Sequence, residues 1–285
     1  DYSYDDDDSN FAFQNPIFAQ KKRNNKSKNP YNAPDFNGLT PMHYAAMFGR
    51  LDIIQYLWTK GAKIDKYKDN KGNLPIHLAC LYGHTETVKF LYENGTKIVS
   101  KSPHVLQPIH YACIGGYTST IEYLINQGAD INALANSKTP IFYAARFGSL
   151  EAVKLLVKNG AKFNFKRRKT SPIIEASLGG HADVVNYFLQ QGCDPNIYIS
   201  NGMTPLIASI YGNNANIVKL LIKNGANFSD QTSKKRKGKK EISYDKESKT
   251  QLFKEIVRLN SFSDSDSFDP LIMISRNANV EIFNI

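Results

Sequence analysis

The stretch TPMHYAAMFG, residues 40–49, opens a pattern that returns along most of the chain. The later copies are LPIHLACLYG (74–83), QPIHYACIGG (107–116), TPIFYAARFG (139–148), SPIIEASLGG (171–180) and TPLIASIYGN (204–213). Their prolines stand at positions 41, 75, 108, 140, 172 and 205, which gives a nearly constant period. A second glycine follows every proline at one fixed distance, from Gly61 after Pro41 to Gly225 after Pro205. A fixed period of this length predicts an array of stacked supersecondary units.

Each copy predicts a short helix, a turn and a second helix. Thr or Ser before Pro is a typical helix start, in which the hydroxyl caps a free amide and proline takes the first helical position. The glycine that ends each quoted copy, replaced by Asn213 in the last one, predicts a left-handed residue that ends the first helix. The stretch LDIIQYLW (51–58) has apolar residues at helical spacing, and the second glycine is expected to close this second helix.

These motifs resemble the ankyrin repeat, whose units recur every ~33 residues and share a T-P-L-H-x-A core. The resemblance covers residues 37–229. It implies an all-α repeat solenoid of stacked helix-turn-helix units with hairpin-like finger loops. Val105, Ser137 and Lys169 replace the turn glycine that precedes the proline in the other copies, and Ile210 takes a small-residue position. These departures bear on the turn geometry of three loops and on the packing of the sixth layer.

We divide the chain into four segments. Residues 1–36 form an irregular, acidic then basic N-terminal segment, and residues 37–229 form six repeats. Residues 230–268 are either a diverged repeat or a basic and acidic insertion with one helix. Residues 269–285 start a further repeat that is cut off inside its second helix. Since the chain also begins without Met, we expect a fragment of a longer array.

Composition narrows the class of protein. Apolar residues make up 41% and aromatic residues 12%, which is enough to bury a core. The net charge of +10 favours acidic partners or anionic surfaces. No apolar run approaches ~18 residues and no signal peptide opens the chain, so we expect no membrane insertion and an intracellular, cytoplasmic location, with the nucleus as an alternative. Three cysteines without metal-ligand spacing argue against a disulfide scaffold.

Three histidines, His43, His77 and His110, share one repeat position. A ladder of metal sites is disfavoured, because stacked helices lie ~8–10 Å apart whereas zinc ligands lie ~2 Å from the ion. We expect buried histidines that join helix starts to loops. By the same argument Cys80 and Cys113 are too far apart for a disulfide and act as small core residues.

No sequence motif points to catalysis. The chain lacks the nucleophile elbow, the phosphate-binding loop, the dinucleotide fingerprint and the HExxH zinc motif. Glu86, Glu122, Glu151 and Asp183 recur at one position of successive second helices, which predicts an outward polar face rather than a catalytic pair. We therefore expect no enzymatic activity and no cofactor.

The basic charge lies in the loops between repeats. The loop 160–172 alone carries a net charge of +5. The resemblance implies that these finger loops border a concave face, into which the two residues before each first-helix glycine point. We predict partner-binding residues on that face and on the fingers: Met47, Phe48, Leu81, Tyr82, Arg146, Phe147, Tyr211, Lys63, Lys66, Lys68, Lys71, Lys166, Arg167, Arg168 and Lys169. The alternative is that the face residues merely pack between layers.

These features predict a non-catalytic, monomeric interaction scaffold that binds an acidic protein partner. A second hypothesis is a nuclear regulatory or adaptor protein, with an import signal at Lys234, Lys235, Arg236, Lys237, Lys239 and Lys240. Nucleic-acid binding is disfavoured, since no groove-reading motif is present and no aromatic residues are interleaved with the basic run. A third hypothesis is that the repeats are one arm of a larger multidomain protein. The acidic start DYSYDDDDSN (1–10) is a hypothetical competitor for the basic fingers.

Overall fold

The structure is a computed structural model that describes residues 29–99, 105–164, 170–200 and 202–227. These residues contain twelve α-helices. A short 3-10 helix, η2 (Pro30–Asn32), precedes them. The first helices of the repeats are α1 (Pro41–Met47), α3 (Pro75–Leu81), α5 (Pro108–Gly115), α7 (Pro140–Arg146), α9 (Pro172–Leu178) and α11 (Pro205–Tyr211). The second helices are α2 (Leu51–Thr59), α4 (Thr85–Glu93), α6 (Thr118–Asn126), α8 (Leu150–Lys158), α10 (Ala182–Gln190) and α12 (Ala215–Lys223).

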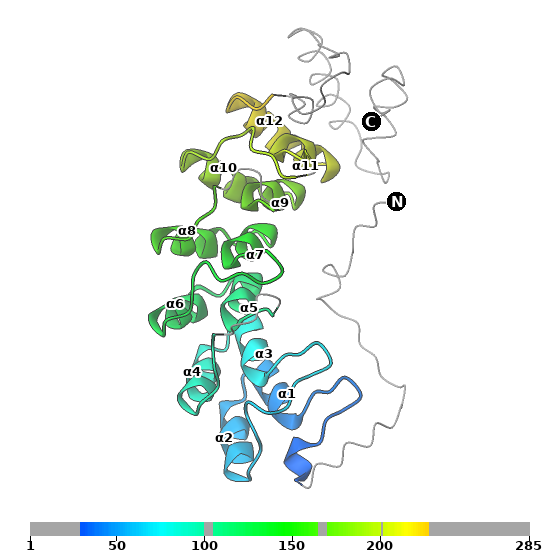
Figure 1. The fold of residues 1–285 in the computed structure, drawn as a ribbon, viewed down its shortest axis with the longest axis vertical. Helices are drawn as coiled ribbons and strands as arrows, with labels where there is room; N and C mark the ends of the chain where they lie inside the picture. Colours follow the sequence, from blue (N-terminus) through cyan, green and yellow to red (C-terminus); the bar gives the residue numbers. More distant parts are fainter. Residues whose placement is uncertain (1–28, 100–104, 165–169, 201, 228–285) are drawn as a thin grey trace.

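The helices stack as six pairs in chain order. Figure 1 shows the odd-numbered helices along the concave side of a curved stack and the even-numbered helices along its convex side. Every first helix starts at the repeat proline, whose fixed φ suits the first helical position. The predicted all-α repeat solenoid is therefore confirmed. None of the described helices combines the length and apolar character that a bilayer span requires.

The turns that end the first helices follow the predicted backbone conformation. The residues there have φ between 52° and 80°, in the left-handed region: Gly49, Gly83, Gly116, Gly148, Gly180 and Asn213. This conformation is strained for most residues with a Cβ but not for glycine, and asparagine tolerates it. The period of glycines in the sequence is thus a period of tight turns between the two helices of each repeat.

The predicted hydroxyl caps are only partly present. At the start of α11, the Thr204 hydroxyl accepts a hydrogen bond of 3.2 Å from the third helical amide, as expected. At the start of α1 the Thr40 hydroxyl instead bonds Nδ1 of His43 at 2.8 Å, because the imidazole occupies the space above the helix start. Thr139 and Ser171 form no cap bond with their helices. Ser171 has φ −145° and ψ 129°, unlike the other helix starts, and its buried hydroxyl has no partner.

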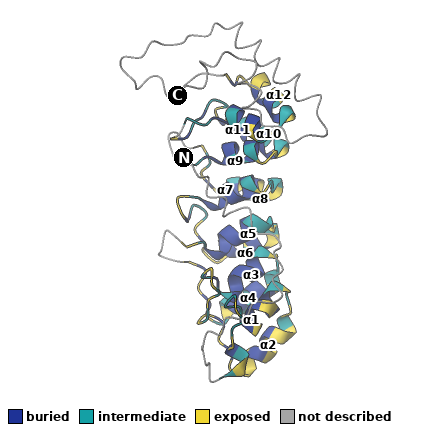
Figure 2. Ribbon diagram, turned by 90° about the vertical axis from the view of Figure 1, so that its right-hand side faces the viewer, coloured by how far each residue is buried: buried dark blue, intermediate teal, exposed yellow. Residues whose placement is uncertain are grey.

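The core runs through the stack between successive layers and between the two rows of helices (Figure 2). The paired small positions of the first helices are almost fully buried, which lets the layers approach closely. Ile210, the bulky residue at this position in the sixth copy, is also buried, in α11. Cys80, Cys113 and Cys193 are free and buried, in agreement with the predicted role of Cys80 and Cys113 as small core residues.

One finger loop forms a tight turn without the usual glycine. Asn136 and Ser137 have φ of 50° and 66°, and Ala135 and Lys138 exchange two backbone hydrogen bonds of 2.9 Å. Two consecutive left-handed residues between a bonded pair are typical of a type I′ turn. Val105 and Lys169 are the other two residues that replace this glycine, and Lys169 lies outside the described residues.

We expect Ser137→Gly to stabilise the protein, because glycine removes the strain of a left-handed residue that carries a Cβ. The expected gain in the free energy of unfolding is roughly 0.5–1 kcal/mol, measured by urea unfolding. Ser137→Ala is the control, since it keeps the Cβ and removes only the hydroxyl. Equal stabilities of the two variants would contradict this explanation.

Candidate functional site

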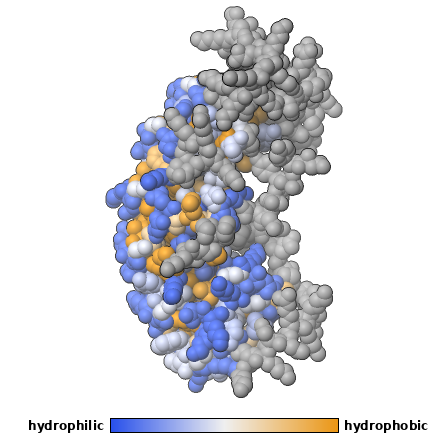
Figure 3. Space-filling model, in the orientation of Figure 1, coloured by the Kyte–Doolittle hydropathy of each residue, from blue (hydrophilic) through white to orange (hydrophobic). Residues whose placement is uncertain are grey.

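The concave face offers a candidate binding surface with two edges. The finger loops lie at the start of the first helices, and the predicted face residues lie at the ends of these helices. Seven helical residues at ~1.5 Å each separate the two edges by about 10 Å. In the view of Figure 1, patches of apolar surface lie among polar surface on the side of the stack (Figure 3).

The ends of the first helices expose a row of aromatic rings. Phe48 is 61% exposed, and Tyr82, Phe147 and Tyr211 are 41–49% exposed. The neighbouring Met47, Leu81 and Arg146 are half-buried. Packing between layers therefore accounts for much of the burial of Met47, Leu81 and Arg146 but leaves a large part of the four aromatic rings accessible.

Sequence reasoning missed one member of this row, Tyr117. Its ring is 41% exposed in the third layer. It lies against Gly83 and Gly115, since a methyl group on either glycine would come within 2.6 Å of a ring atom. The signal was present: Gly115 stands where layers one, two and four carry Phe or Tyr, and an aromatic residue follows two positions later. Layers one, two, three, four and six each expose one aromatic ring on this edge.

Arg146 carries the only predicted positive charge among these helix-end residues. Its guanidinium nitrogen lies 3.7 Å from a carboxylate oxygen of Glu175 in α9, and its backbone carbonyl accepts a 2.8 Å hydrogen bond from Nε2 of His181. The side chain thus has an acidic neighbour within the stack.

Two aspartates shape the first two finger loops. Asp69 accepts hydrogen bonds of 2.9 and 2.7 Å from the amides of Lys71 and Asn73. Asp35 accepts equivalent bonds from the two corresponding amides of the preceding finger. The amide of Asn70 joins the two fingers by a 2.9 Å bond to the Asn37 carbonyl.

The second finger, residues 61–74, presents the predicted lysines on this braced loop. Its four lysine side chains are exposed: Lys63, Lys66, Lys68 and Lys71. The ammonium group of Lys66 lies 5.7 Å from the ring centre of Tyr67, a cation–π contact. Lys166, Arg167, Arg168 and Lys169 of the fifth finger lie outside the described residues, as do Lys234, Lys235, Arg236, Lys237, Lys239 and Lys240.

Two of the three repeated histidines, His43 and His110, join a helix start to the next finger, as predicted, and His77 bonds its own helix start. Nδ1 of His110 accepts a 3.1 Å bond from the Gln107 amide, and its Nε2 lies 3.1 Å from the Ala133 carbonyl in the next finger. His43 makes the same pair of contacts, to the Thr40 amide and the Asn73 carbonyl. These partners require a neutral ring with its proton on Nε2. Burial favours that form, because it lowers the pKa of His43 and of His110.

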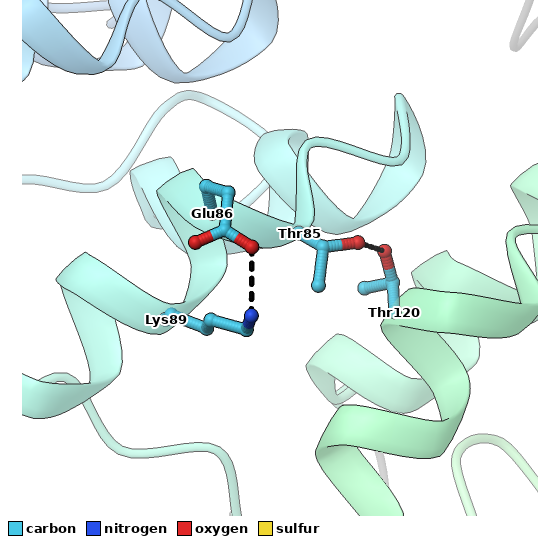
Figure 4. Close-up of polar contacts among 4 residues, drawn as sticks. All are labelled: Thr85, Glu86, Lys89 and Thr120. Atoms are coloured by element: carbon cyan, nitrogen blue, oxygen red, sulfur yellow. Dashed lines mark hydrogen bonds and ion pairs between the residues drawn. The ribbon is translucent and has the colours of Figure 1, made fainter.

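The convex side carries the predicted outward polar face. Glu86 bonds Lys89 on its own helix at 2.7 Å, and Thr85 bonds Thr120 of the next layer at 2.8 Å (Figure 4). Glu151 pairs in the same way with a lysine three residues on. The carboxylates at this repeat position are exposed on successive helices, which is typical of a solvated surface.

Comparison with known proteins places these features in a family. A sequence-family model for ankyrin repeats in three copies matches residues 12–102, 104–167 and 163–232. The crystal structure of the human ASB11 ankyrin repeat domain is similar, with a TM-score of 0.61 and 25% sequence identity. That match covers 80% of this chain and 100% of the other. No curated protein sequence matched the chain.

Proposed function

This chain belongs to the ankyrin repeat family, whose members generally act as non-catalytic modules for protein–protein interaction, and we propose that it is such a scaffold for an acidic protein partner. The partner lies across the concave face, between the finger loops and the ends of the first helices. The protein acts as a monomer and inside the cell.

The row of exposed aromatic rings on one edge of the concave face, with a lysine-rich finger on the other edge, is the observation that supports this proposal. Aromatic side chains are enriched at binding hot spots because they bury large areas at small entropic cost. Lysines on an exposed loop attract acidic chains over several ångströms and raise the association rate. A surface with both features suits a segment that carries acidic and apolar residues together.

The spacing of the layers suggests the form of this segment. Stacked helices lie ~8–10 Å apart, and an extended chain advances ~3.3 Å per residue, so about three residues of partner span one layer. In the polyproline II conformation, which has three residues per turn and a rise of ~3.1 Å per residue, every third side chain points to the same side. A segment of this kind with an apolar residue at every third position would place these residues beside successive rings. Acidic residues between them would face the fingers.

We expect peptides selected on this surface from a random library to bind less tightly as salt rises. Their affinity should fall about tenfold or more between 50 and 500 mM salt, because salt screens exposed charges. Replacing Lys63, Lys66, Lys68 and Lys71 by alanine should weaken binding and flatten the salt dependence, whereas Lys154→Ala on the convex helix α8 should change neither. Affinity that is insensitive to salt and to the four alanines would rule out the finger site.

A nuclear regulatory or adaptor role is the second candidate. It rests on six basic residues among the seven at positions 234–240, a composition typical of import signals. This role is compatible with the scaffold proposal, since an imported chain could still bind its partner through the concave face. The repeats could equally serve as the binding arm of a larger multidomain protein.

A further inference from the structure

The first layer exposes side chains that every later layer covers. Ile53 of α2 is 44% exposed, whereas its counterparts are at most 2% exposed: Thr87, Thr120, Ala152, Val184 and Ile217. Tyr56 is 55% exposed, and its counterparts are half-buried: Phe90, Tyr123, Leu155, Tyr187 and Leu220. In α1, Pro41 is exposed although the other five repeat prolines are buried. Tyr44 is 40% exposed, while its counterparts Tyr111 and Tyr143 are nearly buried.

We call Pro41, Tyr44, Ile53 and Tyr56 the N-terminal face. It spans both helices of the first layer, and Figure 2 shows exposed segments on α2 at this end of the stack. The contacts between later layers show what is missing. The rings of Trp58 and Phe90 meet edge to face at 5.8 Å, and those of Tyr92 and Tyr123 at 6.3 Å. Tyr56 occupies the receiving position of such a pair, and no helix pair precedes its layer among the described residues. The ring of Tyr31 from η2 meets it edge to face at 6.5 Å, yet Tyr56 stays 55% exposed.

The chain just before this face already follows the path of a preceding repeat. The side-chain oxygen of Asn32 accepts a 2.8 Å bond from the Lys63 amide. Asn132 and Asn196 accept bonds of the same length from the amides of Lys162 and Asn227, which stand at the same repeat position as Lys63. Residues 29–32 are therefore placed like the end of a repeat. The family match also begins at residue 12, before the first described layer.

We propose that residues 11–19 of this chain cover the N-terminal face as a partial preceding layer. This segment contains Phe11, Phe13, Ile17 and Phe18, which supply the apolar side chains that the face lacks. Its tether is short, because Asn29 donates a 3.0 Å bond to the Lys60 carbonyl at the end of α2. The 11 residues from Phe18 to Asn29 reach up to ~36 Å, more than the ~14 Å length of α2.

The cover is a partial layer rather than a seventh full repeat. The positions one repeat before the core residues Ile54 and Leu57 of α2 are Lys21 and Asn24, which do not suit a buried helix face. The same offset places Ala12 at the small position of Ala45. A tethered segment also has a high effective concentration at the face, which favours it over a second copy of a chain with a net charge of +10.

Photo-crosslinking in the full chain tests this proposal. Benzoylphenylalanine at position 56 should link within one molecule to a peptide that contains residues 11–19. Position 58 is the matched control, because Trp58 is 44% exposed on the same helix but packs toward α4. We expect at least tenfold more of this product from position 56 than from position 58. Links to the segment around Tyr31 are expected in any case, because its ring lies 6.5 Å from that of Tyr56. Equal yields of the 11–19 product, links to any further segment in its place, or covalent dimers would overturn the proposal.

Hydrogen exchange provides a second readout that does not depend on the inserted residue. Replacing Phe18 by aspartate in the full chain should speed amide exchange in α2 about tenfold and leave α10 unchanged, because only the first layer loses its cover. In an Ile53→Ser background the same replacement should have a smaller effect, since docking of the segment would bury both residues in one interface. A full and equal effect in both backgrounds would contradict docking on this face.

Discussion

Gly148→Ala is expected to lower the free energy of unfolding by about 2–5 kcal/mol, from backbone strain plus overpacking. Gly148 has a φ of 73°, where the Cβ of an alanine crowds the backbone. The added methyl group would also lie 2.3 Å from Nδ1 of His181, whose ring lies over this glycine. Moving that ring would break the 2.8 Å bond from Nε2 to the Arg146 carbonyl.

Gly160→Ala separates the two causes. Gly160 has a φ of 89° but no atom within 4 Å of the position its Cβ would take. The Gly160→Ala variant should lose only ~1–2 kcal/mol of the free energy of unfolding, which is the cost of a left-handed residue with a Cβ. Urea unfolding followed by circular dichroism gives both values. If the two variants lose the same free energy of unfolding, the contact between His181 and Gly148 does not contribute to stability.

This contact belongs to a set that sequence reasoning did not identify. Before three of the second helices, the residue just ahead of the helix lies over a glycine of the preceding layer and bonds a carbonyl at the end of that layer's first helix: His84, His181 and Asn214. His84 bonds the Met47 carbonyl at 2.9 Å, and the Asn214 amide bonds the Ser177 carbonyl at 3.1 Å. These bonds satisfy acceptors that the short first helices leave unpaired.

The repeat predicted the elements well because its signals act locally. Proline and glycine restrict or free their own backbone angles, so the starts of the first helices and the turns after them could be placed from spacing alone. The hydroxyl caps at Thr40 and Ser171 could not, because they depend on a neighbouring imidazole or on local loop angles. The candidate site was partly predictable. Phe48 and Tyr82 follow the repeat, whereas the position of the Tyr117 ring depends on the space beside two glycines in different layers.

Acidification should destabilise the stack between pH 6.5 and 4, because two buried histidines must stay neutral. Burial lowers the pKa of His77 and of His110 to about 4, from 6.5 in the unfolded chain. In this pH window the unfolded chain therefore binds more protons than the folded chain. The stabilisation is fully present above pH 6.5 and is lost as pH falls toward 4, by about 3 kcal/mol for each histidine.

His77→Phe isolates one of these contributions, and the protein itself supplies the precedent. Phe142 stands at the same repeat position in the fourth layer and is fully buried. The variant should be somewhat less stable at pH 7.5, since the Leu74 amide loses its 2.9 Å bond to Nδ1. Its stability should then fall by about 3 kcal/mol less than that of the unchanged protein as pH drops from 6.5 to 4.

Urea unfolding at fixed pH values measures the difference between the two proteins. Carboxylates also titrate toward pH 4, but they are common to both chains and their contribution cancels when one curve is subtracted from the other. The difference between the curves therefore reports the protonation of His77 alone. Parallel curves across the window would mean that His77 becomes protonated in the folded stack without a loss of stability. The bond from the Leu74 amide to the neutral His77 ring would then not stabilise the helix start.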